Sequence, residues 1–231
     1  MRIIFLGPPG SGKGTYSSRI AHILGVPHIS TGDIFREEVK NGTVLGREVA
    51  GYMSRGDLVP DEITIRVLKE RLSRPDAEKG FILDGFPRTI RQAEELEKIT
   101  KIDVVILLNM PENILIEKLT ARRVCSNCGA NYNIASIHRV VDGVMYRLPP
   151  LLPKRPGVCD ECGGKLVQRK DDTLQVIQER LEVYKKQTES LIEFYEKRGL
   201  IENVHINAGL VETVPKIMEQ LEKVKQKSSA E

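Results

Sequence analysis

The chain has 231 residues and a formal net charge of +3, and 40% of its residues are hydrophobic and 29% are charged. This composition is typical of a soluble globular protein with one large domain, and the length leaves room for an inserted module. The small, evenly spread charge argues against nucleic acids or membrane surfaces as partners. The longest apolar run, Val104–Met110, is strand-sized and no signal-peptide pattern precedes the first buried segment, so we expect no membrane partner and a cytoplasmic location.

Apolar runs alternate with segments of helical periodicity, which predicts an α/β fold: a five-stranded parallel sheet flanked by helices in three layers. The expected strands are Ile3–Leu6, His28–Ser30, Phe81–Asp84, Val104–Asn109 and Asn203–Asn207. The expected helices are Lys13–Leu24, Gly32–Lys40, Leu45–Arg55, Asp61–Leu72, Ile90–Lys98, Asn113–Arg122, Leu174–Lys197 and Val211–Lys225. The stripe in 174–197 could suit a coiled coil, but it spans only about three heptads, so we expect one helix packed on the core. The tail lacks apolar periodicity, and residues 228–231 are expected to be disordered.

A glycine-rich stretch, Gly7-x4-Gly12-Lys13, joins the first predicted strand to the first predicted helix. In that context backbone N–H groups point into a concavity at the helix N-terminus and the lysine adds a mobile charge, so the pattern predicts a phosphate-binding P-loop. A plain flexible turn is the alternative, which the spacing and flanks disfavour. Gly14 follows the lysine and Thr15 comes next, so the usual magnesium-binding hydroxyl is displaced by one place. We therefore expect Mg²⁺ to be held through phosphate oxygens and waters, as in a small nucleotide kinase rather than a GTPase.

Three further stretches carry polar side chains that could form a second site. "STGDIFREE" begins a helix, "RGDLVPDE" is a loop, and "LDGFPRTIRQ" places Asp84 at the end of a strand. Ligands of open α/β sheets gather outside the carboxyl ends of the strands, so Asp84 should face the P-loop. Structural alternatives remain: Thr31 could cap its helix, and Thr89-x-x-Gln92 matches a capping box.

The stretches "GPPGSGKGT", "STGDIFR", "LDGFPRT", "RRVC" and "RKDD" resemble the adenylate kinases, and the resemblance covers essentially the whole chain. It implies a phosphotransferase that converts ATP and AMP into two ADP with Mg²⁺ and so serves adenine nucleotide homeostasis. The implied ATP site is Gly10, Ser11, Gly12, Lys13, Gly14, Thr15, Arg122, Asn131 and Tyr132. The implied AMP site is Thr31, Arg36, Asp57, Leu58, Val59, Gly85, Phe86, Pro87, Arg88, Gln92, Arg169 and Arg180. Within it the resemblance favours adenine contact over capping alone for Gln92.

The implied catalytic residues are Lys13, Asp84, Arg88, Arg122, Arg169 and Arg180, with Asp84 on a water of Mg²⁺. Guanidinium forks suit phosphate oxygens, and phosphoryl transfer depends mainly on positioning and charge. A phosphate acceptor is already ionised, so no general base is required, and the sequence offers no dedicated one. Lys118 stands where many relatives have an arginine that stacks on the ATP adenine, which predicts a looser requirement for the donor base.

Residues 122–170 interrupt the alternation of strands and helices and contain Cys125-x2-Cys128 and Cys159-x2-Cys162, each pair followed by glycine. Four thiolates at this spacing predict a closed tetrahedral zinc site, which would be structural because no coordination position is left open. Disulfides, free thiols, a redox pair, and cobalt or iron in place of zinc are the alternatives. The resemblance implies that this segment is the long lid that closes over ATP and excludes water.

The predicted organisation is a core of residues 1–121 and 171–227, an AMP-binding subdomain at 30–60 within that span, and a zinc-binding lid at 122–170. We expect a monomer with ATP and AMP or ADP as partners. The acceptor could instead be UMP or CMP, although Gln92 and "TGDIFR" favour AMP. A zinc-ribbon nucleic-acid binder would need aromatic residues among basic clusters beside the cysteines, and only 5% of the residues are aromatic.

Overall fold

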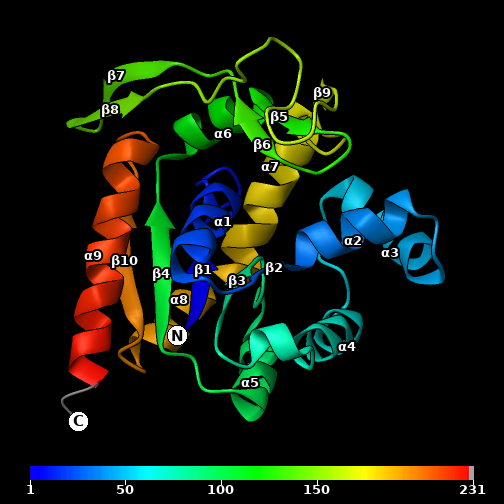
Figure 1. Cartoon of the computed structure of the whole chain (residues 1–231), viewed down its shortest axis with the longest axis vertical. Helices are drawn as coiled ribbons and strands as arrows, with labels where there is room; N and C mark the ends of the chain where they lie inside the picture. Colours follow the sequence, from blue (N-terminus) through cyan, green and yellow to red (C-terminus); the bar gives the residue numbers. More distant parts are fainter. Residues whose placement is uncertain (229–231) are drawn as a thin grey trace.

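The computed structural model describes residues 1–228 (Figure 1). Of the tail predicted to be disordered, 228–231, residues 229–231 lie outside the described residues, and the prediction is wrong for Ser228, which belongs to helix α9 (Leu210–Ser228). The centre of the fold is a five-stranded sheet in the order β10-β4-β1-β3-β2, and every neighbouring pair is parallel. The strands are β1 (Arg2–Leu6), β2 (His28–Ser30), β3 (Phe81–Asp84), β4 (Val104–Asn109) and β10 (Ile201–His205). The predicted fold class is therefore confirmed, and only the last strand is displaced, by two residues, from its predicted range.

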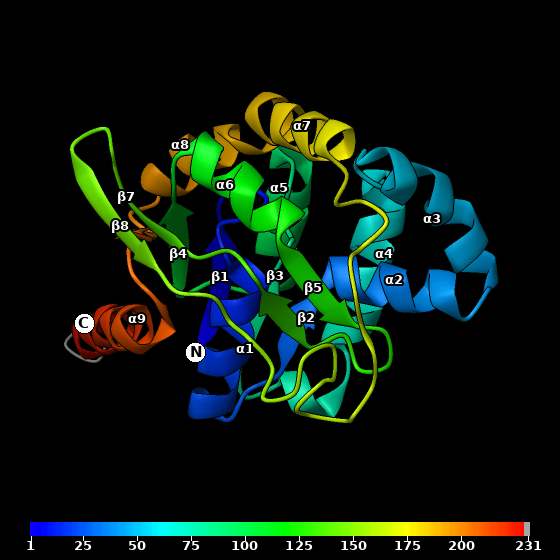
Figure 2. The ribbon, with the colours of Figure 1, turned by 90° about the horizontal axis from the view of Figure 1, so that it is seen from above.

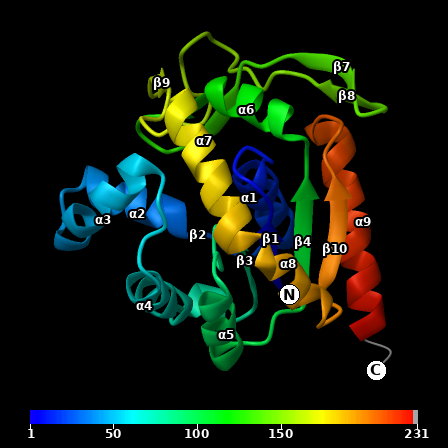
Figure 3. The same ribbon diagram turned by 180° about the vertical axis from the view of Figure 1, so that it is seen from behind.

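The helices are α1 (Lys13–Leu24), α2 (Thr31–Lys40), α3 (Val44–Arg55), α4 (Asp61–Leu72), α5 (Ile90–Ile99), α6 (Glu112–Thr120), α7 (Leu174–Val183), α8 (Ser190–Glu196) and α9 (Leu210–Ser228), with a 3₁₀ turn at Pro75–Ala77. They cover both faces of the sheet, because its inner strands β1, β3 and β4 are apolar on both faces. Ile3 and Phe5 pack in one buried cluster with α1, α6, α7 and α9, whereas Ile4 and Leu6 pack in another with α4, α5 and α8. Figure 3 shows α9 running alongside β10 at the edge of the sheet.

Three helix predictions need correction. The predicted helix 174–197 is interrupted by a π-helical turn, η2 (Tyr184–Thr188), which separates α7 from α8. The helix predicted to reach Arg122 stops at Thr120, because Arg122 already pairs with Asn133 in a strand. The last helix continues to Ser228, beyond its predicted end at Lys225.

The inserted segment contains two small sheets. A three-stranded sheet in the order β6-β5-β9 joins β5 (Arg122–Cys125), β6 (Asn131–Asn133) and β9 (Leu166–Val167). The second is a hairpin of β7 (Ile137–Val141) and β8 (Val144–Leu148), which was not predicted. Asp142 and Gly143 at its tip have φ angles of 49° and 77°, as a two-residue hairpin turn requires. Figure 2 shows the hairpin and α3 on opposite sides of α1.

Residues 30–60 form α2, α3 and the loop that follows, and they have an apolar cluster of their own. Phe35, Val49, Val59 and Val67 make up this third cluster, in which Val67 of α4 connects it to the core. Among the described residues no helix combines the length and apolar character needed to cross a membrane.

Candidate active site

Glycines shape the loop between β1 and α1. Gly7, Gly10 and Gly12 have positive φ angles of 142°, 89° and 95°. A Cβ at Gly7 would lie 2.5 Å from the carbonyl oxygen of Leu108, so the loop packs directly on β4. α1 begins at Lys13 with neither a side-chain cap nor an acidic residue in its first turn. Its N-terminal N–H groups and dipole are thus available to an anion from outside the helix.

The Lys13 ammonium group lies folded against this loop. Its Nζ donates to the carbonyl oxygen of Gly7 at 2.6 Å and to that of Pro8 at 2.9 Å. Burial lowers the pKa of Lys13 to about 7, and nearby arginines add to this effect while the Asp84 carboxylate opposes it. A bound phosphate would favour the charged form of Lys13.

Five arginines face the cavity into which the loop opens: Arg36, Arg88, Arg122, Arg169 and Arg180. Burial, with the neighbouring Arg122 adding to it, lowers the pKa of Arg169 to about 9 and that of Arg180 to about 10. Guanidinium groups this close repel one another, so their arrangement costs free energy that bound anions would offset.

Two aspartates of the sequence "RKDD" hold these arginines. The Asp172 carboxylate, in a residue only 1% exposed, accepts two N–H bonds from Arg122, the one from Nε at 2.8 Å. Asp171 accepts from Arg180 Nη1 at 3.0 Å. This role could not be predicted from the sequence, because Asp172 and Arg122 are 50 positions apart and only the fold brings them together.

Asp84 lies at the carboxyl end of β3 against the P-loop, in agreement with its position in the sequence. A Cβ on Gly14 would lie 3.1 Å from Asp84 Oδ2. On the other side, His28 Nε2 lies 3.7 Å from the same oxygen and 2.9 Å from Ser17 Oγ. The carboxylate is thus positioned between the loop and a largely buried histidine, which the sequence analysis did not identify.

Two neighbouring cavities make up the site. The larger, of about 220 Å³, lies over the P-loop, and the smaller, of about 60 Å³, lies beside α2, α3 and the end of β3. Their shared walls include Arg36, Leu58, Gly85, Arg88 and Arg180. The arrangement can therefore hold two anionic ligands with arginines between them.

The side chains of Gln92 and Thr31 do not make the helix-capping hydrogen bonds that the sequence left open as an alternative. Thr89 caps α5, accepting from the N–H of Gln92 at 3.2 Å. The Gln92 side chain, however, accepts from the Arg88 N–H at 2.8 Å and donates to Asp61 Oδ1 at 2.7 Å. Thr31 is not a cap, because Ser30 caps α2 and the Thr31 hydroxyl donates to the Gly85 carbonyl oxygen at 2.8 Å.

Most residues predicted for the site line these cavities. The larger cavity is lined by Gly10, Gly12, Lys13, Gly14, Thr15, Arg36, Leu58, Asp84, Gly85, Pro87, Arg88, Arg122, Asn131, Tyr132, Arg169 and Arg180. The smaller one adds Thr31, Asp57, Val59 and Gln92. Ser11 and Phe86 lie behind the walls: Ser11 is fully buried with its N–H donating to the Pro8 carbonyl oxygen, and Phe86 packs in the apolar cluster.

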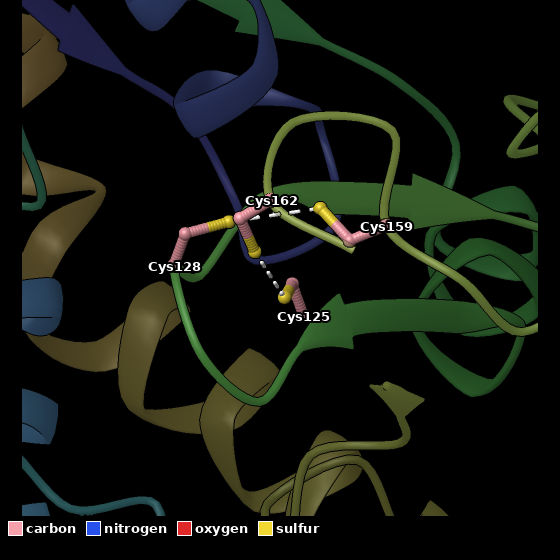
Figure 4. Close-up of side chains that lie close together, drawn as sticks. All are labelled: Cys125, Cys128, Cys159 and Cys162. Carbon is pink, nitrogen blue, oxygen red and sulfur yellow. Dashed lines mark hydrogen bonds between the residues drawn. The ribbon is translucent and has the colours of Figure 1, made fainter. Parts of the chain in front are cut away.

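The four cysteines converge from the two ends of the inserted segment (Figure 4). Their Sγ atoms lie within 4.8 Å of one another, with 3.5 Å between Cys125 and Cys162 and 3.6 Å between Cys128 and Cys159. None of the four cysteines forms a disulfide, since these distances far exceed an S–S bond of about 2.05 Å. A tetrahedral ion with metal–sulfur bonds of about 2.3 Å holds its ligands roughly 3.8 Å apart. The cluster can therefore hold a metal ion.

The backbone turns tightly at the glycine that follows each cysteine pair, as the sequence predicts. Gly129 donates its N–H to the Cys125 carbonyl oxygen at 3.1 Å, and Gly163 donates to that of Cys159 at 2.9 Å. Both glycines have positive φ angles, 77° and 74°, which a residue with a Cβ rarely adopts.

Comparison with known proteins gives one consistent result. A family model described as adenylate kinase matches residues 5–200. The adenylate kinase of Clostridium tetani is 50% identical over 206 residues, which cover 87% of this chain and 89% of that protein. That of a Geobacillus species is 50% identical over 212 residues, covering 90% and 91%. That of Acetivibrio thermocellus is 45% identical over 230 residues, covering 97% and 100%.

Proposed function

The chain belongs to the adenylate kinase family, and on that premise we propose how its residues carry out the reversible, Mg²⁺-dependent reaction in which ATP and AMP give two ADP. The observation that carries the proposal is the convergence of Lys13 and five arginines on two neighbouring cavities. Two nucleotides bring several negative charges together, and fixed cations offset their repulsion and the charge of the transition state. The enzyme is thus a phosphotransferase with a phosphate acceptor, acting in adenine nucleotide homeostasis.

The ATP phosphates bind at the P-loop and the start of α1. The free helix N-terminus supports this role, as does the loop backbone that glycines bring close to the cavity. Lys13 exchanges its carbonyl partners for the outer phosphates, and Arg122 binds the same phosphates. Asn131 and Tyr132 border the nucleotide from the lid side.

AMP binds in the smaller cavity. Arg36 and Arg88 hold its phosphate, which is supported by their presence in the wall that both cavities share. Gln92 reads the adenine edge after exchanging Asp61 or the Arg88 N–H for the base. Arg169 and Arg180 reach the transferring phosphoryl group from the lid side. The remaining contacts come from Thr31, Asp57, Leu58, Val59, Gly85 and Pro87.

The acceptor needs no general base, because the AMP phosphate is already ionised at neutral pH. Mg²⁺ that accompanies ATP neutralises phosphate charge when bound. Asp84 would hold that ion through one of its waters. This is supported by the position of its carboxylate against the P-loop, where His28 holds it from behind.

The inserted segment acts as a lid that a structural zinc ion stabilises. The spacing of the four sulfur atoms fits tetrahedral coordination. The lobe around the cysteines has only a small apolar cluster of its own, so it gains most of its stability from the metal. We propose further that residues 30–60 move as an AMP-binding unit, that residues 1–121 and 171–227 form the core, and that the enzyme is a cytoplasmic monomer.

A coupled assay with each nucleoside monophosphate, with Mg²⁺ and with excess EDTA, tests the acceptor. AMP should give a kcat/KM on the order of 100-fold above UMP and CMP, with no turnover in EDTA. If the enzyme preferred UMP or CMP, that nucleotide would be the acceptor in place of AMP, and the assignment of the fold would stand.

In the same assay GTP should serve as a donor with a kcat/KM comparable to that of ATP, since Lys118 cannot stack on a base as arginine does. A large preference for ATP would dismiss that donor prediction.

Nucleotide binding should draw a proton onto the enzyme. Lys13, with a pKa of about 7, is mostly neutral at about pH 8.5 in the free enzyme, and the bound triphosphate raises its pKa. Calorimetric titration with a non-hydrolysable ATP analogue and Mg²⁺, in buffers of different ionisation enthalpy, should show uptake approaching one proton. Lys13→Met should remove most of this uptake. Equal uptake by both proteins would contradict the assignment.

A further inference from the structure

The β7–β8 hairpin belongs to the inserted segment by sequence but packs on the core. Ile137, Tyr146 and Leu148 are 2%, 1% and 6% exposed, and they join the apolar cluster of β1, β4 and α9. The residues around Cys125 and Cys159 form a separate cluster. The segment thus consists of a cysteine lobe, residues 122–133 and 151–170, and a hairpin whose apolar face is part of the core.

Polar contacts attach β8 to the end of β10 and the residues that follow it. Tyr146 Oη lies 2.7 Å from His205 Nε2. The Arg147 N–H donates to the Asn207 carbonyl oxygen at 2.8 Å, and Asn207 Nδ2 donates to the Met145 carbonyl oxygen at 3.5 Å. Three consecutive residues of β8 therefore contact the core.

A second set of contacts attaches the base and strand β7 of the hairpin to α6. Where the cysteine lobe meets the hairpin, Asn133 Nδ2 at the end of β6 donates to the Lys118 carbonyl oxygen at 2.8 Å. The Ile134 N–H donates to the carbonyl oxygen of Ala121 at 3.1 Å. Further along, Arg139 forms an ion pair of 2.7 Å with Glu117. The hairpin is therefore held from two directions, by α6 and by the end of β10.

Between these two attachments the hairpin closes one end of the larger cavity. Ile137 and Leu148 of the hairpin and Pro149 directly after it line this cavity together with Lys118 and Leu119 of α6 and residues 208–210. Pro149 packs so closely on Gly209 that a Cβ there would lie 2.9 Å from the proline ring. This end of the cavity is mostly apolar, which suits the flat face of a base rather than a phosphate.

The location of this end relative to the P-loop indicates which nucleotide reaches it. The hairpin and α2–α3 lie on opposite sides of α1 in Figures 1 and 2. Since the smaller cavity is on the α2–α3 side, the acceptor occupies that side. A donor whose phosphates lie at the start of α1 therefore extends its base toward the hairpin.

We propose that the β7–β8 hairpin is a fixed wall of the donor-base site, which stays with the core and keeps the base of the nucleoside triphosphate in position while the cysteine lobe opens and closes. This inference rests on the proposed function, because it takes the P-loop ligand to be the donor. Leu148, Ile137 and Pro149 are then positioning residues for the donor and not for AMP.

Steady-state kinetics of variants at Leu148 and Pro149 test whether this wall positions the donor base. Leu148→Ala and Pro149→Ala should each raise the KM for ATP, on the order of tenfold for the leucine, and leave the KM for AMP within about twofold. Leu148→Met should restore most of the loss. Leu221→Ala removes an equally buried leucine of the same cluster that does not line the cavity, so it should destabilise the protein without this selective change. Pro149 is exposed, so its variant retains the fold even if Leu148→Ala does not.

The proposed wall would be overturned if the KM for ATP were unchanged in Pro149→Ala and, where it folds, in Leu148→Ala. Equal increases in the KM values for ATP and AMP would also overturn it. A wild-type enzyme that fails to phosphorylate AMP would instead overturn the proposed function, so the two failures are distinguishable.

Hydrogen exchange measured by mass spectrometry tests whether the wall is fixed. Without nucleotide, residues 137–148 should exchange as slowly as peptides of the core sheet, and the cysteine lobe should exchange faster. Addition of a non-hydrolysable ATP analogue should slow exchange mainly in the cysteine lobe. A hairpin that exchanges as fast as the cysteine lobe, and becomes protected only with nucleotide, would show that it moves with the lid.

Discussion

Replacing Arg122 by lysine should lower kcat by about 100-fold or more, with a smaller change in the KM for AMP. Arg122 lies over the P-loop cavity and presents a planar guanidinium group, which two N–H bonds to the buried Asp172 carboxylate hold in orientation. Lysine retains the positive charge, but it lacks the planar fork that matches phosphate oxygens and cannot form the pair of hydrogen bonds to Asp172. Phosphoryl-transfer enzymes depend on such groups by factors of about 10³ or more.

The adjacent arginine supplies a matched control. Arg123 donates to the carbonyl oxygens of Thr120 and Arg122 and does not line the cavity. Arg123→Lys should therefore keep kcat within about threefold of the wild-type value. Stopped-flow single-turnover measurements separate phosphoryl transfer from product release. If Arg122→Lys and Arg123→Lys slowed phosphoryl transfer equally, the catalytic role of Arg122 would be lost.

The sequence predicts the central sheet well because its information is local. β2, β3 and β4 begin and end at the predicted residues, and β3 and β4 are short apolar runs that each end at a polar residue. The π-helical turn could not be predicted in this way. Thr188 donates to the Arg88 carbonyl oxygen, a contact across 100 positions, and this wider turn brings Tyr184 and Thr188 to the cavity.

The β7–β8 hairpin was not predicted either, although the sequence contains a local signal for it. Asp142-Gly143 is a strong two-residue turn between alternating residues, but the cysteines and prolines around it dominated the interpretation of the segment. Its attachment to the core depends on Tyr146 meeting His205, 59 positions away, which no local pattern encodes.

In the candidate site, too, the sequence predicts the functional residues themselves better than the partners that position them. The P-loop and the cysteine pairs were predicted from residue type and short spacing, whereas the roles of the arginines were predicted from the family resemblance. Their positioning partners were missed. Asp61 holds Gln92, and Asp172 holds Arg122, through contacts of 31 and 50 positions in the sequence. Such partners are ordinary charged residues until the fold brings them to a ligand-binding group.

Removal of the metal from the cysteine lobe should unfold that lobe and leave the core sheet folded. Four thiolates around one ion can contribute on the order of 10 kcal/mol to folding, whereas the apolar cluster of the lobe consists of Cys125, Tyr132 and Cys159 with two partly buried neighbours. Treatment with a strong chelator should speed hydrogen exchange across residues 122–133 and 151–170. Exchange in β1, β3 and β4 should change little.

Activity should fall when the lobe unfolds, because Tyr132 connects the four-cysteine cluster to the larger cavity. Tyr132 lines the larger cavity, while its hydroxyl donates to Cys159 Sγ at 3.6 Å and accepts from the Asp160 N–H at 2.7 Å. Loss of the metal frees this ring and the neighbouring Asn131, which accepts from Arg169 at 3.2 Å. We therefore expect kcat/KM to fall at least tenfold after chelation and to recover when zinc is restored.

Cys128→Ser should reproduce the chelated state, since it removes one ligand. Ser126→Ala removes an exposed hydroxyl of the same turn, which donates one hydrogen bond to the Lys165 carbonyl oxygen, but it removes no ligand and should stay close to wild type. Elemental analysis of the purified protein should give one metal ion per chain and identify it. A chelated protein with an unchanged unfolding profile and unchanged exchange would exclude a structural metal. Loss of the core sheet together with the lobe would instead mean that the metal stabilises the whole chain, because the lobe and the core would then unfold as one cooperative unit.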